Sequence, residues 1–364
     1  MNDSTHVFIY LTGPGWHILK EHAFMTKYCK YQFPIQSQLG CSHAALSSTL
    51  TGKDPEKHGH FSSYYFKKSN TILETAQRFY SKVISKKSGY FGKYSVPLRN
   101  LNCFVQSNHY SKKLMPGYFS PLISIIDMVH EKKLAHSIVN TNSIPPVQAL
   151  KNLRYRLKNE TLAFAFIHID EMDDLLHCYP YDFQRIDTKF RSYEKQIKKI
   201  ITAGINGHSN FNLTIFSGHG MTLAPQKINI KKKINSLGIT YGHDYHAVYD
   251  PTMAYFWFKN KSAKSIIHDK LHKLRHCKIL SHKEKKEFGI NFSDKRYGET
   301  IALVDPGFQI FPNDVLPCSL PGMHGYDPNH SDSLGACLST QKISPSPNRV
   351  KDFFSIMANF VTEY

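Results

Sequence analysis

Three short apolar runs, each nearly free of polar residues, constrain the fold of this chain more than any other feature. They read HVFIYL at 6–11, LAFAFIHI at 162–169 and LTIFS at 213–217. Strands with this continuous apolar character are typical of sheets that are covered on both faces. The segment LGACLST at 334–340 predicts a further strand near the end of the chain. These runs predict a sheet buried between two layers.

Helical patterns separate the predicted strands. Apolar residues repeat every three or four positions between the second and third runs, at Ile186, Phe190, Tyr193, Ile197 and Ile200. Gly204 follows as a stop signal, and 348–361 has the pattern of a closing helix. Strand–helix–strand alternation of this length predicts an α/β fold, a three-layer αβα sandwich with a largely parallel central sheet.

Residues 225–321 differ in character from the rest of the chain. They contain the strand-like segments TMAYFWF, CKILS and ETIALV around one helical segment. We predict an inserted cap subdomain at 225–321, with 1–224 and 322–364 forming the core. Residues 61–117 are rich in Lys, Ser, Tyr and Asn and predict surface structure near the mouth of a pocket.

The composition narrows the class of protein. The 364 residues are 41% hydrophobic and 13% aromatic, which is typical of globular proteins. No apolar run approaches the roughly 20 residues of a transmembrane helix, so we expect no membrane span. The start of the chain shows no basic segment followed by a long apolar one, and the seven cysteines form no C-x-x-C pair. These features predict a reducing compartment and a cytoplasmic location.

The chain carries a formal net charge of +18. A field of that sign attracts anions, which leaves three partners open: a phosphorylated small molecule, nucleic acid or an acidic membrane surface. A solvated lysine surface without a partner accounts for the charge equally well. No helix-turn-helix, zinc-finger or RNA-recognition signature accompanies the charge, so nucleic acid is the weakest of these hypotheses.

Acidic and imidazole side chains follow the predicted strands, at the edge where such sheets bind ligands. Asp173 and His177 are four residues apart, so on a helix they face the same side and could hold one cation. His324 would complete a set of three ligands with one position open, the arrangement of catalytic zinc. In the alternative interpretation Asp173 is an ordinary exposed acid and His324 a turn residue.

Two more candidates lie beside glycine-rich turns. A helix is predicted to begin at Ser42 or His43 and to stop at Thr51–Gly52. Ser42 could be a simple N-cap, or a nucleophile at a helix end that stabilises a bound phosphate. His219 follows the third apolar run between two glycines, where the backbone can approach a ligand closely.

Five motifs occur in the order seen in one known family: TGPGW, CSHAALSSTLTGKDPEKHGHF, EMDDLLHCYP, SGHGMT and GMHGYDP. In these motifs the chain resembles the type I phosphodiesterase/nucleotide pyrophosphatase branch of the alkaline phosphatase superfamily. The resemblance spans nearly the whole chain. It implies an alkaline phosphatase-like sheet sandwiched by helices, with two adjacent metal ions, usually zinc, at the carboxyl edge of the sheet.

The resemblance also implies residue roles. Ser42 falls at the position of the nucleophile, and one metal ion would be held by Asp173, His177 and His324. Asp174 offers a competing register, but the family's spacing favours Asp173. The ligands of the second ion fall at Thr12, Ser42, Gly218 and His219, so both carboxylates of that site are missing. His219 is then the remaining ligand of a disabled site, and we expect one divalent ion, with zinc the usual metal.

These features support two main hypotheses. The first is a metal-dependent hydrolase or transferase acting on a phosphoric ester (a phosphodiester or nucleotide), with Ser42 as nucleophile, His219 or His43 as its base, and a single retained metal site. The second is an inactive phosphodiesterase-like protein that binds an anionic ligand or a protein partner. The expected substrate of the first is a phosphorylated small molecule or a nucleotide. The sequence predicts neither the leaving group nor the oligomeric state.

Overall fold

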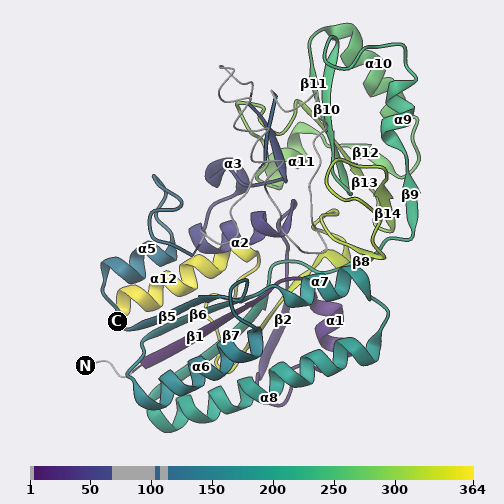
Figure 1. Ribbon diagram of the computed structural model, residues 1–364. Coiled ribbons are helices and arrows are strands. Elements are labelled where there is room, and N and C mark those ends of the chain that lie inside the picture. Colours follow the sequence, from purple (N-terminus) through teal and green to yellow (C-terminus); the bar gives the residue numbers. More distant parts are fainter. Residues whose placement is uncertain (1–3, 68–102, 107–113) are drawn as a thin grey trace.

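The computed structural model describes residues 4–67, 103–106 and 114–364 (Figure 1). The surface structure predicted for 61–117 falls largely outside these described residues. Within them, no helix combines the length and the apolar character needed to cross a membrane.

A six-stranded sheet forms the centre of the fold, in the order β2-β16-β7-β1-β6-β5. Four of the strands are parallel to one another: β1 (Ser4–Leu11), β5 (His136–Asn140), β6 (Phe164–Ile169) and β7 (Asn210–Ser217). The strand β16 (Gly335–Ser339) pairs antiparallel with both β7 and β2 (Tyr31–Ile35). The predicted largely parallel sheet is confirmed, with β16 as the reversed strand.

The register of the central strands brings their carboxyl ends to one edge. Leu11, the last residue of β1, pairs with Ile169 of β6 on one side and with Ser217 of β7 on the other. Asp170 and Gly218 follow directly, so the segments that carry the candidate residues leave the sheet side by side.

Helices cover both faces of the sheet, which confirms the predicted three-layer arrangement (Figure 1). One face carries α6 (Pro146–Asn159) and α8 (Phe183–Gly207), together with α1 (Trp16–Glu21). The other carries α2 (Ser42–Thr51), α5 (Ile125–Glu131) and α12 (Phe353–Glu363). Side chains along β1 point alternately to the two faces of the sheet. Val7 and Ile9 pack toward α6, α8 and α1, while Phe8 and Tyr10 pack toward α2, α5 and α12.

A second, antiparallel sheet lies within residues 225–321. Its strands run in the order β10 (Tyr245–Tyr249), β11 (Met253–Phe258), β13 (Thr300–Val304) and β12 (Cys277–Ile279). The helices of this segment are α9 (Ile230–Asn235), α10 (Lys261–His272) and α11 (His282–Glu287). The hydrophobic core around this sheet also takes in Leu39, Phe61, Tyr64 and Phe104, which precede the segment. The division into a core and a cap at 225–321 therefore stays a prediction.

Shorter elements complete the described chain. Three two-stranded pairs are β3 (Tyr64–Phe66) with β4 (Phe104–Gln106), β8 (Thr222–Leu223) with β15 (Gly322–Met323), and β9 (Gln226–Ile228) with β14 (Phe308–Ile310). The short helices are α3 (Pro55–His58) and α7 (Glu171–Cys178), with single 3₁₀ turns at Ser331–Ser333 and Val350–Asp352.

The closing helix begins later than its apolar pattern predicts. The predicted range was 348–361, whereas α12 starts at Phe353 after the 3₁₀ turn. The Asp352 carboxylate accepts hydrogen bonds from the backbone amides of Asn348 and Arg349. This local side-chain contact holds the turn outside the α-helix, because it satisfies amides at the entry to the helix.

Candidate active site

Ser42 is the first residue of α2. The preceding residue, Cys41, has an extended backbone, and Gly52 ends the helix in the left-handed conformation with φ of 66°. This confirms the helix limits that the sequence predicts. Only 5% of the Ser42 side chain and backbone surface is exposed, so its hydroxyl group needs polar partners within the protein.

Asp173 and His177 lie one turn apart on α7, directly after β6. The Nε2 atom of His177 lies 3.8 Å from Oδ2 of Asp173, and its Nδ1 atom contacts the Gly322 carbonyl oxygen at 2.9 Å. Asp174, the competing acid, is exposed, whereas Asp173 is buried. The structure therefore directs Asp173 rather than Asp174 toward the histidines.

Gly13 allows the loop after β1 to approach Asp173. Its φ of 100° is a conformation that side chains other than glycine rarely adopt. A Cβ atom at this position would lie 2.7 Å from the Asp173 Cα atom and 3.0 Å from its Oδ1 atom. The glycine of the TGPGW motif thus has a packing role next to the candidate site.

His219 and His324 are brought together by a short strand pair. His219 follows β7, and His324 follows β15, whose residue Met323 pairs with Thr222 of β8. The centroids of the two imidazole rings are 4.1 Å apart. The Nδ1 atom of His219 contacts the Gly220 carbonyl oxygen at 3.0 Å, which leaves Nε2 as the atom with a lone pair facing the site.

The hydroxyl group of Ser42 is the point where these side chains meet. It donates to Oδ2 of Asp173 at 3.2 Å. The Nε2 atoms of His219 and His324 each lie 3.2 Å from the same oxygen. Four segments far apart in the sequence therefore contribute side chains to one cluster, in which Ser42, Asp173 and His219 are buried and His324 is partly exposed.

The spacing of this cluster fits a metal ion. The remaining separations are 3.8 Å from His324 Nε2 to Asp173 Oδ2 and 4.0 Å from His219 Nε2 to Asp173 Oδ1. Tetrahedral zinc with bonds of about 2.1 Å has ligand atoms about 3.4 Å apart. Asp173 Oδ1 and His324 Nδ1 are buried and have no hydrogen-bond partner. One carboxylate, two imidazoles and a hydroxyl group form a donor set that such an ion accepts.

The side chains that cluster in the structure differ in one member from the metal ligands that the family resemblance implies. Among the described residues, the donor atoms of Asp173, His219 and His324 all lie within 4.8 Å of one another. His177, the predicted third ligand, is outside this set although its Nε2 atom faces Asp173. The His177 ring lies one helical turn after Asp173 on α7, where its Nδ1 atom contacts the Gly322 carbonyl oxygen.

Burial also prepares the imidazoles to bind a cation. Desolvation lowers the pKa of His219 below its ordinary value. Desolvation, with the neighbouring imidazoles of His219 and His177, lowers the pKa of His324 well below that value. Both rings are therefore neutral at physiological pH, the form that ligates metals.

Among the described residues, those at the positions that the resemblance assigns to the second ion offer it no carboxylate. The Thr12 hydroxyl lies 2.8 Å from His168 Nε2, so that hydroxyl already has a partner. A Cβ atom at Gly218 would lie 2.0 Å from the Tyr10 hydroxyl oxygen and 2.8 Å from the Ala45 Cβ atom. An aspartate cannot be placed at 218 without moving these neighbours, so the residues present do not fit a second ion.

Sequence reasoning missed Tyr10 and His168. Both lie inside apolar runs, where a tyrosine or histidine is consistent with simple packing. The Tyr10 hydroxyl is buried without a hydrogen-bond partner, and its ring packs against Phe216 and His168. No local signal in the sequence links Tyr10 with Gly218, which lies more than two hundred positions further along the chain.

Comparison with solved structures places this fold among known proteins. Murine ectonucleotide pyrophosphatase/phosphodiesterase 5 is similar with a TM-score of 0.69 at 16% identity, over 98% of this chain and 95% of that chain. Its inactive variant in complex with AMP has a TM-score of 0.69 at 15% identity, over 99% and 95%. The human protein has a TM-score of 0.67 at 15% identity, over 98% and 95%. These similarities show the predicted alkaline phosphatase-like fold.

Sequence comparison identifies the family. No curated protein sequence matches the chain. Residues 41–327, more than half of the chain, match the profile of the type I phosphodiesterase/nucleotide pyrophosphatase family. The chain therefore belongs to the type I phosphodiesterase/nucleotide pyrophosphatase family, which confirms the hydrolase class predicted from the sequence.

Proposed function

We propose that the chain is a single-metal phosphodiesterase with Ser42 as its nucleophile. Asp173, His219 and His324 would hold one divalent ion, and the Ser42 oxygen would be its fourth ligand. The observation that carries this proposal is the close grouping of these four side chains, with Ser42 Oγ 3.2 Å from Asp173 Oδ2 and from the Nε2 atoms of His219 and His324. In this assignment His219, the expected remnant of a second site, joins the ligands of the first.

A bound divalent ion would lower the pKa of the serine hydroxyl group and neutralise negative charge on the phosphate. Ser42 would attack the phosphorus atom, and the alcohol or nucleotide on the opposite side would leave. Water would then release the phosphoryl group from Ser42. The Ser42 proton has an acceptor in place, because its hydroxyl already donates to Asp173 Oδ2.

The start of α2 supports binding of the phosphate itself. Ser42 stands in the first turn of this helix, whose amide groups and dipole favour negative charge. These fixed dipoles would replace part of the stabilisation that a second ion gives in two-metal enzymes. His177 would orient the Asp173 carboxylate from behind, since it is itself anchored to the Gly322 carbonyl.

A nucleotide is the substrate class that we propose. The similar murine protein has a solved structure in which its inactive variant is in complex with AMP. The positive charge of this chain would favour the approach of such an anion. A nucleotide phosphodiester is therefore the first substrate to test, with an activated generic phosphodiester beside it.

The decisive experiment combines metal analysis with turnover. We expect about one tightly bound zinc or manganese ion per chain, and cleavage of bis(p-nitrophenyl) phosphate that falls by at least about a thousandfold in Ser42→Ala. Ser47→Ala is the matched control, because Ser47 lies on the same helix but its hydroxyl contacts His60 Nδ1 at 2.8 Å instead. Two bound ions, or full activity in Ser42→Ala, would overturn the proposal.

The inactive-protein alternative has its own observation in support. Thr12 and Gly218 stand where the family's second metal site has carboxylates, and Tyr10 fills the space beside Gly218. If the chain binds one ion and AMP but cleaves neither substrate, this alternative replaces the enzymatic proposal. The cytoplasmic location stays a prediction.

A further inference from the structure

Residues of α6 and α8 line a groove. These two helices lie on the face of the sheet opposite α2 (Figure 1). The volume of the groove is about 580 Å³. The cationic side chains that line it are Arg154, Lys158, Lys195, Lys198 and Lys199. Thr202 and Asn206 add groups that can donate hydrogen bonds. Two helices that are separate in the sequence thus contribute five cationic side chains to the lining of one groove.

These charges lack acidic partners. In the described part of the chain, no ion pair joins any of the five cations to a carboxylate. The Lys198 ammonium group lies 5.9 Å from the centroid of the Tyr28 ring. The sequence contains no acid between 146 and 159, or between 195 and 207. The nearest acids along the two helices, Glu160 and Glu194, form ion pairs with Arg156 and Arg191, so the groove has an excess of positive charge.

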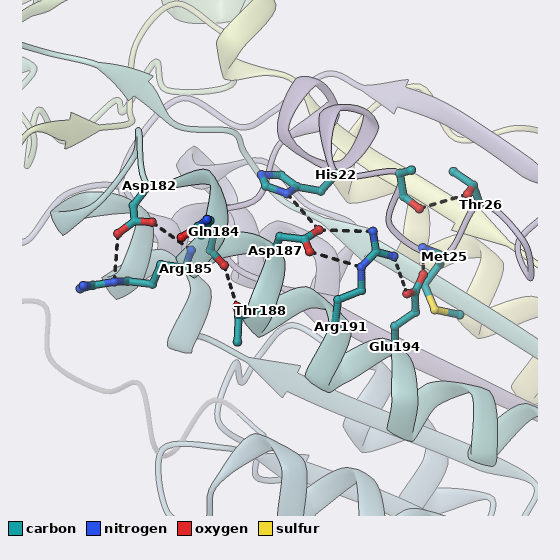
Figure 2. A network of polar contacts seen from close by, with 11 residues as sticks. His22, Met25, Thr26, Asp182, Gln184, Arg185, Asp187, Thr188, Arg191 and Glu194 are labelled. Carbon is teal, nitrogen blue, oxygen red and sulfur yellow. Dashed lines mark hydrogen bonds and ion pairs between the residues drawn. The ribbon is translucent and has the colours of Figure 1, made fainter.

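The first half of α8 serves as an internal comparison. There, cations and acids form a network (Figure 2), in which Arg191 pairs with Asp187 at 3.3 Å and with Glu194 at 3.0 Å. Arg185 pairs with Asp182 at 3.2 Å in the same region. The helix changes from paired to unpaired cations at Lys195, so a uniformly lysine-rich surface does not describe it.

Helix energetics explain only one member of the cluster, Lys158, which lies in the last turn of α6 where the helix dipole favours a cation. Lys195 and Lys199 are four residues apart, as are Arg154 and Lys158, and like charges at this spacing destabilise a helix. Lys195 to Lys199 lie about two turns or more before the end of α8 at Gly207, beyond the reach of the helix dipole. The like-charge spacings of Lys195 with Lys199 and of Arg154 with Lys158 are unfavourable, and a bound anion would offset this repulsion.

The groove is separate from the candidate active site. The end of α8 leads within three residues into the start of β7, whereas His219 follows the other end of that strand. The cations therefore lie toward the amino edge of the sheet, and Ser42, Asp173, His219 and His324 lie at the carboxyl edge. An anion in the groove does not contact the proposed catalytic residues.

We propose that this groove binds a compact ligand that carries two or more adjacent phosphate groups. The volume lies in the range of small-ligand sites, about 300–1,000 Å³. A single phosphate would engage only part of a five-cation cluster, whereas a polyphosphate group can face both helices at once. The same chemistry occurs in free polyphosphates and in multiply phosphorylated lipid headgroups. The inference does not depend on the proposed hydrolase activity.

The test uses inorganic triphosphate as the probe and calorimetric titration of the full chain. We expect saturable binding that is weakened about tenfold in Lys195→Gln/Lys199→Gln, because two contacts with a multiply charged anion are removed. Lys232→Gln/Lys233→Gln on α9 is the matched control, with the same loss of charge from exposed lysines. Its affinity, and the phosphodiesterase activity of both variants, should equal those of the wild type.

Three outcomes would overturn the proposal. They are equal weakening in both double variants, no saturable triphosphate binding at low salt, or binding only to an oligonucleotide with an affinity that grows with its length. Vesicles containing phosphatidylinositol bisphosphate distinguish the two sources. Binding to these vesicles that depends on Lys195 and Lys199 identifies a headgroup, and binding to triphosphate alone identifies a free ligand.

Discussion

At the scale of single residues, the candidate site depends on one oxygen atom. Ser42 Oγ lies 3.2 Å from a carboxylate oxygen and from two imidazole nitrogens, and all three partners are on other segments of the chain. Such a cluster is costly to bury without a cation, because the Asp173 carboxylate keeps one oxygen without any hydrogen bond. The individual histidines therefore have distinguishable roles.

Removing single imidazoles should separate a ligand from an orienting residue. We expect His219→Ala to lower zinc affinity by at least about a hundredfold, and His177→Ala by about tenfold, the range for residues that orient a ligand. Metal content after dialysis against graded zinc buffers measures both. If His177→Ala loses the ion while His219→Ala keeps it and loses only turnover, the ligand set implied by the family resemblance is the right one.

Gly218 and Tyr10 should depend on each other. Gly218→Ala places a Cβ atom 2.0 Å from the Tyr10 hydroxyl oxygen, so we expect a loss of about 1–3 kcal/mol in unfolding free energy. Tyr10→Phe removes that oxygen and should recover part of the loss in the double variant. Urea denaturation of the four proteins in this cycle gives the coupling energy, and strictly additive effects would contradict the close contact.

At the scale of elements, the second sheet contains a buried acid at the end of β10. Asp250 accepts hydrogen bonds from Ser62 at 2.6 Å and from Tyr255 at 3.0 Å. Burial raises its pKa to about 6, with a smaller contribution from Asp314. This carboxyl group joins the segment after α3 to the antiparallel sheet, so its protonation affects the packing of two parts of the chain.

The raised pKa predicts a pH-dependent stability. Because the folded-state pKa exceeds the unfolded value, the contribution of Asp250 is fully present below about pH 4 and is lost as pH rises through about 6. Asp250→Asn removes this titration. We expect the unfolding free energy of the variant to rise relative to the wild type by up to about 3 kcal/mol between pH 4 and 7. A difference in unfolding free energy between Asp250→Asn and the wild type that stays the same at every pH would contradict this account.

At the scale of the whole molecule, the proposed metal centre links segments that the chain keeps far apart. Ser42, Asp173, His219 and His324 follow four different elements, and His324 comes after the whole of 225–321. An ion bound to all four would stabilise the native state only, since the unfolded chain does not bring them together.

Metal removal should therefore lower the thermal stability of the protein. With free zinc at about a hundred times its dissociation constant, binding adds about 2.7 kcal/mol to the unfolding free energy. We expect the melting temperature to fall on treatment with a chelator and to recover on addition of zinc. In calorimetry, the melting temperature of His324→Ala should neither fall with the chelator nor rise with zinc. If this variant responds to both as the wild type does, the proposed centre is contradicted.

The sequence by itself predicted four of the six strands of the central sheet, their mainly parallel arrangement and the residues of the candidate site. Apolar runs report burial on both faces, and the segments that follow two of them carry Asp173 and His219. Both signals are local in the chain. The tertiary structure alone decided the direction of β16, the grouping of His219 rather than His177 with Asp173 and His324, and the closure of the space at Gly218 by Tyr10. It also decided that the cations of α6 and α8 share one groove. These properties depend on distances between residues far apart in the sequence, and such distances are set by packing rather than by any local pattern.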